Sequence, residues 1–172
     1  MDHLFLPVTA AAARQFVLWV YEPPYDVYNM VDDQNDPNLV DAAVNYFLDP
    51  EIDCYVMADE DGKVLAFCTF GDDAQVPGGD YSLEAVDIGL GVRPDLTGRG
   101  LGSQFVTAVT RFAILVLQPD TLRVTIAAFN ERALRVWMRQ GFVVVQQFTA
   151  TVGNKWPFYI LEKELPDTEE GV

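Results

Sequence analysis

Three glycines stand at alternate positions, Gly98, Gly100 and Gly102, in the stretch "GVRPDLTGRGLGSQF", between an apolar run typical of a strand and an amphipathic run typical of a helix. Glycine inside regular structure costs about 0.5–1 kcal/mol relative to alanine, so a cluster of glycines indicates a backbone that something must approach closely. The N–H groups that open a helix carry partial positive charge and attract phosphate. The sequence therefore predicts an anion-binding loop, to which Arg93 and Arg99 could add charged contacts. The other interpretation is a turn in which glycine only permits tight packing.

Two common glycine-rich loops do not fit this spacing. A Walker loop ends in Gly-Lys-Ser/Thr, whereas Gly102 is followed by Ser103 and Gln104. A dinucleotide fingerprint spaces its glycines as Gly-x-Gly-x-x-Gly near the first strand, whereas these alternate and lie in the middle of the chain. The loop is therefore expected to bind phosphate in another structural setting.

Apolar periodicity and turn residues predict the elements around the loop. They are a strand at 4–8, helices at 11–21 and 37–49, a hairpin at 53–71, a strand at 81–92, a helix at 102–117, a strand at 121–130, a helix at 131–141 and strands at 142–152 and 156–165. Thr9 is the predicted N-cap of the first helix, Gly62 the hairpin turn and Gly141 the end of the last helix. Gly89 and Gly91 indicate a bulge or a close backbone neighbour.

This order of elements predicts an α/β domain in layers, a mixed sheet with helices on its faces. With 172 residues, half of them hydrophobic, the chain is long enough for one core. We expect one domain over residues 1–165 and an acidic C-terminal tail over 166–172.

The net charge of the chain argues against some classes of binding partner. Eleven Lys and Arg against 26 Asp and Glu leave a net charge of −15, which disfavours binding to nucleic acid or to anionic membranes. Such acidity can attract a cationic amine, or it can simply keep the protein soluble. The N-terminal segment shows no secretion signal and no apolar run is long enough to cross a bilayer, so we expect a cytoplasmic protein.

The small numbers of cysteine and histidine residues argue against several kinds of catalytic and metal-binding site. Cys54 and Cys68 lie in apolar runs and are expected to be buried thiols. His3 is the single histidine and lies near the N-terminus, which argues against a Ser–His or Cys–His hydrolase. The same counts exclude a His-rich or Cys-rich metal site, so we expect no metal.

Two motifs in order resemble the GNAT superfamily of acyl-CoA-dependent N-acyltransferases. The run "VRPDLTGRGLG" is similar to the family's Val-x-Pro strand end followed by Gln/Arg-x-x-Gly-x-Gly/Ala. The run "NERALRVWMRQGF" resembles Asn-x-x-Ala-x-x-x-Tyr-x-x-x-Gly-Phe, with matches at Asn130, Ala133, Gly141 and Phe142. The resemblance covers nearly the whole chain and implies a GNAT-like α+β fold with a mostly antiparallel sheet of six to seven strands and helices on both faces.

The resemblance also implies a site for acetyl-CoA as acyl donor. The backbone N–H groups from Gly98 to Ser103 would hold the pyrophosphate, and the strand through Leu90 and Val92 would pair with the pantetheine arm. The amide of Leu90 matches the family's oxyanion donor. Asn130 would contact the pantetheine or the bound amine, and it is also a plausible helix N-cap. The cofactor-binding residues implied are Leu90, Val92, Thr97, Gly98, Arg99, Gly100, Leu101, Gly102, Ser103 and Asn130.

Two residues depart from the family pattern. Thr97 stands at the Gln/Arg position, which removes a cationic contact for which Arg99 could substitute. Trp137 stands where the family often has a tyrosine that protonates the leaving thiolate, and an indole N–H cannot give up a proton at working pH. The chemistry is then slower, uses another acid such as a tyrosine from elsewhere, or is absent.

A base is needed to take a proton from the attacking amine. Glu84 and Asp87 are the candidates, and Glu84 is preferred because it shares side-chain parity with Leu90 along the strand; the alternative is an ordinary solvated carboxylate. In this family the first two helices and the loop between them build the acceptor pocket. That loop carries aromatic and acidic residues that suit either a cationic amine or a solvated lid: Tyr21, Glu22, Tyr25, Asp26, Tyr28, Asp32 and Asp33.

The resemblance thus implies transfer of an acetyl group from acetyl-CoA to a primary amine of a small molecule or a protein, by direct attack in a ternary complex. The alternative is a non-catalytic acyl-CoA-binding module that acts as a sensor or binds a partner. The acceptor and the oligomeric state, a homodimer included, are left open by the sequence.

Overall fold

Seven strands form one sheet in residues 4–167, the range that the structure, a computed structural model, describes. The strands are β1 (Leu6–Pro7), β2 (Cys54–Ala58), β3 (Val64–Phe70), β4 (Val86–Val92), β5 (Thr121–Ala127), β6 (Val143–Thr149) and β7 (Pro157–Glu164). They lie in the order β1-β2-β3-β4-β5-β7-β6, and each neighbouring pair is antiparallel except β4 and β5. The predicted mixed, mostly antiparallel sheet is confirmed. His3 and residues 168–172 of the predicted tail lie outside the described range.

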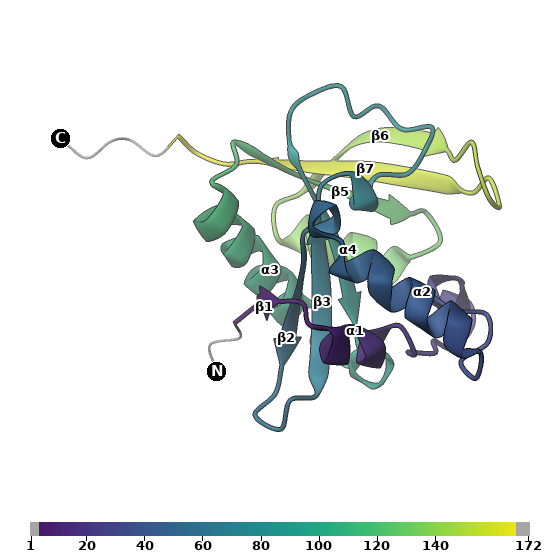
Figure 1. Cartoon of the computed structure of the whole chain (residues 1–172). Coiled ribbons are helices and arrows are strands. Elements are labelled where there is room, and N and C mark those ends of the chain that lie inside the picture. Colours follow the sequence, from purple (N-terminus) through teal and green to yellow (C-terminus); the bar gives the residue numbers. More distant parts are fainter. Residues whose placement is uncertain (1–3, 168–172) are drawn as a thin grey trace.

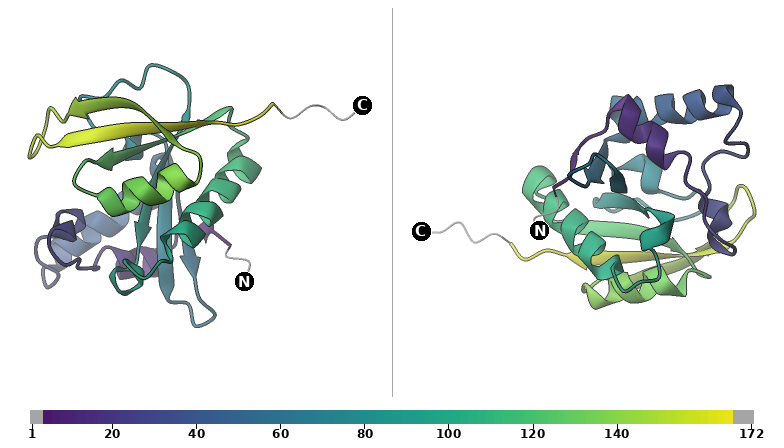
Figure 2. Two further views of the ribbon diagram at one scale, coloured as in Figure 1. Left: turned by 180° about the vertical axis from the view of Figure 1, so that it is seen from behind. Right: turned by 90° about the horizontal axis from the view of Figure 1, so that it is seen from below.

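Four α-helices cover the two faces of this sheet within the described range (Figures 1 and 2). They are α1 (Ala10–Phe16), α2 (Pro37–Leu48), α3 (Gly102–Leu117) and α4 (Glu131–Arg139). The first two lie on one face, and α3 and α4 lie on the other, as the view from behind shows (Figure 2). Thr9 caps α1 as predicted, because its Oγ1 accepts a hydrogen bond from the N–H of Ala12 at 3.2 Å. The single-domain α/β fold with helices on both faces is confirmed.

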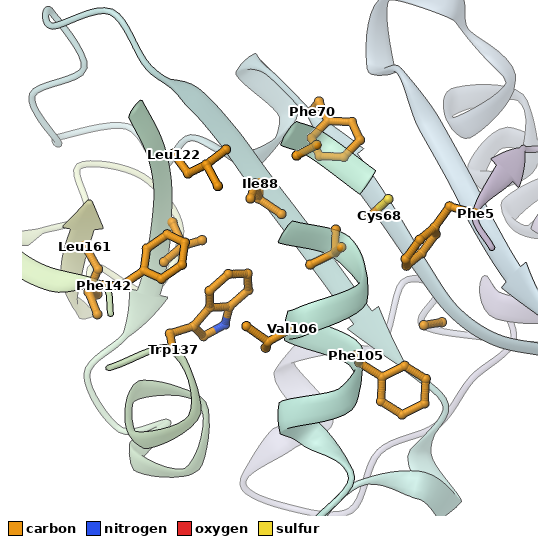
Figure 3. Close-up of a cluster of buried hydrophobic side chains, with 14 of the residues drawn as sticks. Phe5, Cys68, Phe70, Ile88, Phe105, Val106, Leu122, Trp137, Phe142 and Leu161 are labelled. Carbon is orange, nitrogen blue, oxygen red and sulfur yellow. The ribbon is translucent and has the colours of Figure 1, made fainter. Parts of the chain in front are cut away.

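Each face of the sheet has its own hydrophobic cluster. Beneath α1 and α2, Phe16 stacks on Phe67 of β3 with ring centroids 4.3 Å apart, and Phe47 meets both rings edge-on. On the other face, Val106 of α3 and Trp137 of α4 pack against the strands (Figure 3). Full burial of such a side chain stabilises the fold by about 1.5–3 kcal/mol. These two clusters therefore hold the helices at fixed positions against the sheet.

Both cysteines are buried, as predicted. Cys54 of β2 is 6% exposed and Cys68 of β3 is fully covered, and neither is in a disulfide. They pack as small hydrophobic side chains, Cys54 beneath α1 and α2 and Cys68 on the opposite face.

Some helices and strands begin or end at other residues than predicted, because tertiary contacts override the apolar periodicity of the sequence. The first helix ends at Phe16, where the N–H of Trp19 turns back to the carbonyl of Phe16 at 3.1 Å. This turn lets the Trp19 ring pack on Phe67, with centroids 6.0 Å apart. The first strand is reduced to Leu6–Pro7, and the strand predicted at 81–92 begins only at Val86.

Gly89 and Gly91 of β4 are explained by side chains of β3. The register between β3 and β4 runs without a shift from Phe70↔Ile88 to Ala66↔Val92, so a bulge at Gly89 is wrong. A methyl group at Gly89 would lie 2.5 Å from Oγ1 of Thr69, and one at Gly91 would overlap the ring of Phe67. The close neighbours at these glycines are side chains of β3, not the backbone that we expected.

A buried ion pair joins β4 to β5 where the two strands run parallel. Arg123 donates from Nε and Nη2 to the two carboxylate oxygens of Asp87 at 2.7 and 2.8 Å. The two side chains are 1% and 3% exposed, and the residues are also register partners. Arg123 donates further to the carbonyl of Leu83 at 2.8 Å, and Gln75 donates to Asp87 at 2.9 Å. The hydrogen bonds to Asp87 raise the pKa of Arg123, so the guanidinium stays charged.

We expect Asp87→Asn to lower the free energy of unfolding by about 3 kcal/mol, because it removes the buried carboxylate that pairs with Arg123 and leaves only Glu162, 3.8 Å away and one-fifth exposed, as a counter-charge. Urea denaturation measures this loss. Asp41→Asn is the matched control, since Asp41 pairs with Arg14 at 2.8 Å while both side chains are more than half exposed. That exposed pair contributes at most about 1 kcal/mol. Equal losses in the two variants would contradict a structural role for the buried pair.

Candidate functional site

β4 and β5 pair at their first residues and then part. Their register comprises two residue pairs, Val86↔Leu122 and Asp87↔Arg123. Beyond these pairs β4 continues to Val92 and β5 to Ala127, with no register between them in the described structure. Backbone groups of neighbouring strands that lose register need another partner. The open end of this junction is therefore the place for a strand-like ligand.

The backbone of β4 turns alternate residues to its two sides. The N–H of Arg93 donates to the carbonyl of Leu65, which continues the antiparallel ladder with β3 through the odd-numbered residues. Leu90 and Val92 consequently direct their N–H and C=O groups toward β5, on the side without register. This is the orientation that the predicted pairing with pantetheine requires.

The glycine loop presents backbone N–H groups that the protein does not use. Among residues 4–167, no hydrogen bond is formed by the N–H groups of residues 98–103, and no side chain caps α3. Gly98 and Gly100 have φ angles of +71° and +75°, a conformation that disfavours any other residue. No atom lies within 4 Å of a methyl group placed on Gly100, whereas one on Gly102 would lie 3.2 Å from Val136. Tight packing thus explains Gly102, and open approach explains Gly100.

A cation that the sequence analysis missed lies over this loop. A methyl group at Gly98 would lie 3.0 Å from Nη1 of Arg132, and the Arg132 guanidinium also lies 4.2 Å from the centre of the Tyr25 ring. Arg93, by contrast, pairs with Asp95 at 2.6 Å. Arg132 stands two residues after Asn130, at the start of α4, and that proximity in sequence to a predicted site residue was the available signal.

Thr97 and Arg99 flank the loop differently. Thr97 uses its hydroxyl within the turn, donating to the carbonyl of Pro94 at 2.7 Å. Arg99 is exposed among the glycines. Of the two, Arg99 keeps a charge that is free to turn toward a bound anion.

Asn130 lies where the chain passes from β5 to α4. Its Oδ1 accepts from the N–H of Ala133 at 3.1 Å, so the predicted N-cap is confirmed. Its Nδ2 donates to the hydroxyl of Tyr28 at 3.2 Å. The cap thus orients an amide group that also contacts the loop between α1 and α2.

Residues 21–28, which we call the tyrosine strap, join the ends of β4 and β5. The hydroxyl of Tyr21 donates to the carbonyl of Val92 at 2.8 Å, and the hydroxyl of Tyr28 accepts from Asn130. Tyr25 lies against Arg132. Burial raises the pKa of Tyr21 and of Tyr28, so both phenols keep their protons at neutral pH. The acidic residues of the predicted acceptor loop are all exposed: Glu22, Asp26, Asp32 and Asp33.

Trp137 belongs to the hydrophobic core. It is 6% exposed, and its ring meets Phe142 edge-on with centroids 4.9 Å apart (Figure 3). Val106 of α3 lies on its other side (Figure 3). The indole therefore joins α4 to α3 and to the sheet, a packing role that a sequence comparison with the family's tyrosine does not indicate.

The two candidate bases lie at the closed end of the β4–β5 junction. Asp87 is committed to Arg123 and is buried. Glu84 is exposed in the segment before β4, so parity along the strand does not apply to it. From Val86 to Leu90 the strand advances by about 13 Å at ~3.3 Å per residue, and Glu84 lies beyond that end. The structure does not bring Glu84 beside Leu90.

Two further features are absent from residues 4–167. No group of three or more His, Cys, Asp or Glu side chains is arranged to hold a metal ion there. No helix in the same range has the length and apolar character needed to cross a membrane.

The sequence and the fold are similar to those of known proteins. The model of the acetyltransferase (GNAT) family matches residues 14–142. No curated protein matches the chain. Among solved structures, the chain is similar to a chimera of spermidine N-acetyltransferase SpeG from Vibrio cholerae and hSSAT, with TM-score 0.71, 11% identity, and coverage of 95% of this chain and 96% of that chain.

Two further solved structures show the same likeness. The ribosomal-protein-S5-alanine acetyltransferase from Vibrio fischeri has TM-score 0.69 and 10% identity, covering 97% of this chain and 95% of that chain. A putative phosphinothricin N-acetyltransferase has TM-score 0.54 and 23% identity, covering 66% of this chain and 72% of that chain. At these identities the likeness shows the fold.

We expect Gly100→Val to abolish the rise in melting temperature that saturating acetyl-CoA gives the wild-type protein. The valine side chain would fill the open space over the amides and strain a backbone at φ +75°. Gly62→Val is the matched control, because Gly62 has φ +79° and equally open surroundings in the β2–β3 turn. Thermal scans with and without acetyl-CoA compare the variants. Protection retained by Gly100→Val, or lost equally by Gly62→Val, would remove the loop from the site.

Proposed function

The chain belongs to the GNAT acetyltransferase family, and from this premise we propose that it transfers the acetyl group of acetyl-CoA to a primary amine by direct attack while both substrates are bound. The observation that carries the proposal is the row of unused N–H groups at residues 98–103, next to the unpaired side of β4. Solved relatives named as acetyltransferases of spermidine and of a ribosomal-protein alanine support an amine as the acceptor.

The acetyl donor would be held by the glycine loop, by two arginines near it and by strand β4. The N–H groups of residues 98–103 would bind the diphosphate, with Arg132 and Arg99 supplying positive charge. Leu90 and Val92 would pair with the pantetheine amides in the manner of an added strand. Tyr21 already donates to the carbonyl of Val92, so this hydroxyl would share or release that acceptor when the donor binds.

The reaction forms one C–N bond and breaks one C–S bond. The neutral amine nitrogen attacks the thioester carbonyl carbon, and the carbonyl oxygen gains negative charge that the N–H of Leu90 would stabilise. The C–S electron pair leaves with sulfur as a thiolate, and the attacking nitrogen loses one proton to a base. The products are an N-acetyl amine and CoA.

Protonation of the leaving sulfur does not require Trp137. A thiol has a pKa near 8.5, so a thiolate leaves readily at neutral pH. Tyr28 is the tyrosine that we propose as proton donor, because it contacts Asn130 and its hydroxyl hydrogen is not used in that contact. The phenol is protonated at neutral pH, because its ordinary pKa of about 10 is raised further by burial.

Glu84 is the proposed base. Because it lies beyond the closed end of the junction, it would accept the proton through a chain of several ordered waters. Asp73 is the alternative that the structure adds. It accepts hydrogen bonds from Tyr46 and, at 2.8 Å, from Thr69, whose hydroxyl covers Gly89 next to Leu90.

A non-catalytic acyl-CoA-binding module is the second candidate, and Trp137 is the observation that favours it. A core tryptophan at this position removes the family's acid without disturbing the donor site. We also propose residues 1–165 as the domain, residues 166–172 as its acidic tail, and a cytoplasmic protein that acts without a metal and binds neither nucleic acid nor membranes. A homodimer is compatible with these proposals.

Incubation with acetyl-CoA and separate amines tests the function. The panel comprises spermidine, a lysine-containing peptide, tryptamine and tryptophan, with acetylated product measured by mass spectrometry and acetyl-CoA affinity by calorimetry. We expect acetylated product from at least one amine, with CoA formed in equal amount. Affinity for acetyl-CoA without any product would favour the binding module, and no affinity would overturn both proposals.

We expect Glu84→Gln to lower kcat/KM for the amine by at least about tenfold, because an amide cannot accept the proton. Glu60→Gln is the control, since Glu60 is an equally exposed carboxylate in the β2–β3 turn. Steady-state rates at pH 7 and pH 9 are compared, and the defect should shrink at pH 9, where the higher hydroxide concentration offers another acceptor for the proton. An unchanged rate in Glu84→Gln would transfer the role to Asp73, to be tested in turn by Asp73→Asn.

A further inference from the structure

A pocket of about 210 Å³ lies beside the end of β5, next to the proposed reaction site. It is lined by Ala127, the last residue of β5, by Phe129 and by Tyr28 of the tyrosine strap. Tyr28 also contacts Asn130, so the pocket adjoins the open end of the β4–β5 junction.

The pocket is mainly aromatic and aliphatic. The rings of Tyr28 and Phe129 stack with centroids 6.1 Å apart, and Trp156 meets Phe129 edge-on at 5.4 Å. Val76 and Phe158 add apolar surface. A wall of this kind favours an apolar group on the acceptor rather than a chain of ammonium groups.

One charged side chain lines the pocket within the described range, and it is a cation. Lys155 lies in the β6–β7 loop between Asn154 and Trp156, and all three line the pocket. Among residues 4–167 its ammonium group has no hydrogen bond or ion pair with a protein acceptor. Its backbone is left-handed at φ +51°, which is uncommon for a lysine and indicates that the loop holds it in place.

The surrounding backbone fixes the loop that carries this lysine. The N–H of Ala150 donates to the carbonyl of Trp156 at 2.9 Å, which closes the turn. The N–H of Thr151 donates to the carbonyl of Pro77 at 3.0 Å, which ties the turn to the segment before β4. Lys155 is therefore presented on an anchored loop.

We propose that this pocket binds the acceptor, and that the acceptor is an amine carrying an apolar group and a carboxylate, the chemistry of a hydrophobic α-amino acid. The apolar group would lie among Tyr28, Phe129 and Trp156, and the carboxylate would pair with Lys155. A zwitterion has no net charge, so the acidity of the protein does not repel it. This inference rests on the proposed function and narrows its substrate class.

Tryptophan and tryptamine test the inference, because they share the apolar group and the amine and differ in the carboxylate. With acetyl-CoA saturating, kcat/KM is measured for each compound on the wild-type protein and on Lys155→Met, Lys155→Arg and Lys63→Met. We expect the wild type to prefer tryptophan, and Lys155→Met to lower kcat/KM for tryptophan by about tenfold through a higher KM. In that variant, kcat/KM for tryptamine should change less than about twofold, because tryptamine has no carboxylate and makes no charge-assisted contact with Lys155.

The other two variants separate charge from fold. Lys155→Arg should keep most of the preference, and Lys63→Met should keep all of it, since Lys63 is an exposed lysine of the β2–β3 turn. Turnover of tryptamine or spermidine without a preference for tryptophan would overturn this inference and leave the proposed function standing. A preference for tryptophan that survives in Lys155→Met would overturn the role of Lys155. Absence of turnover with every amine would overturn the proposed function and this inference with it.

Discussion

The ion pair between Asp87 and Arg123 determines where the sheet is closed and where it is open. Two hydrogen bonds and near-complete burial hold β4 and β5 together at a single point of the sheet. Past that point, the backbone N–H and C=O groups of β4 no longer pair with those of β5. If the strands paired further, Leu90 and Val92 would satisfy β5 and no strand-like ligand could enter. If they did not pair at all, the junction would lose the hydrogen bonds that fix the two strands next to each other at its closed end.

The rest of the site is attached to the two strands that diverge from this point. β4 leads directly into the glycine loop and α3, while β5 leads into Asn130, Arg132 and α4. Trp137 fills the space between α4 and the rest of the core, so the two arms keep a fixed spacing behind the opening. The tyrosine strap contacts both arms at their far ends, at Val92 and at Asn130. One loop therefore contacts both the elements assigned to the donor and the pocket assigned to the acceptor.

Features that depend on a few consecutive residues could be predicted from the sequence. The glycine loop before α3, the cap at Asn130 and the cap at Thr9 are local, and the structure has them as expected. Features that depend on distant residues could not. The run "NERALRVW" places Arg132 near Asn130, but the contact of Arg132 with Gly98 and the burial of Trp137 in the core depend on how α4 packs. The pocket at Lys155 joins four segments far apart in the chain and has no sequence signature.

The burial of both cysteines affects how the chemistry can be observed. Burial raises the pKa of the Cys54 thiol to about 12, and the pKa of Cys68 is also raised by burial, so neither forms the reactive thiolate in neutral buffer. A chromogenic disulfide reagent added to the native protein would thus meet little competition from the polypeptide. The sulfur of newly liberated coenzyme would supply the colour, and unfolding with guanidinium would then release the two cysteines per chain as an internal calibration.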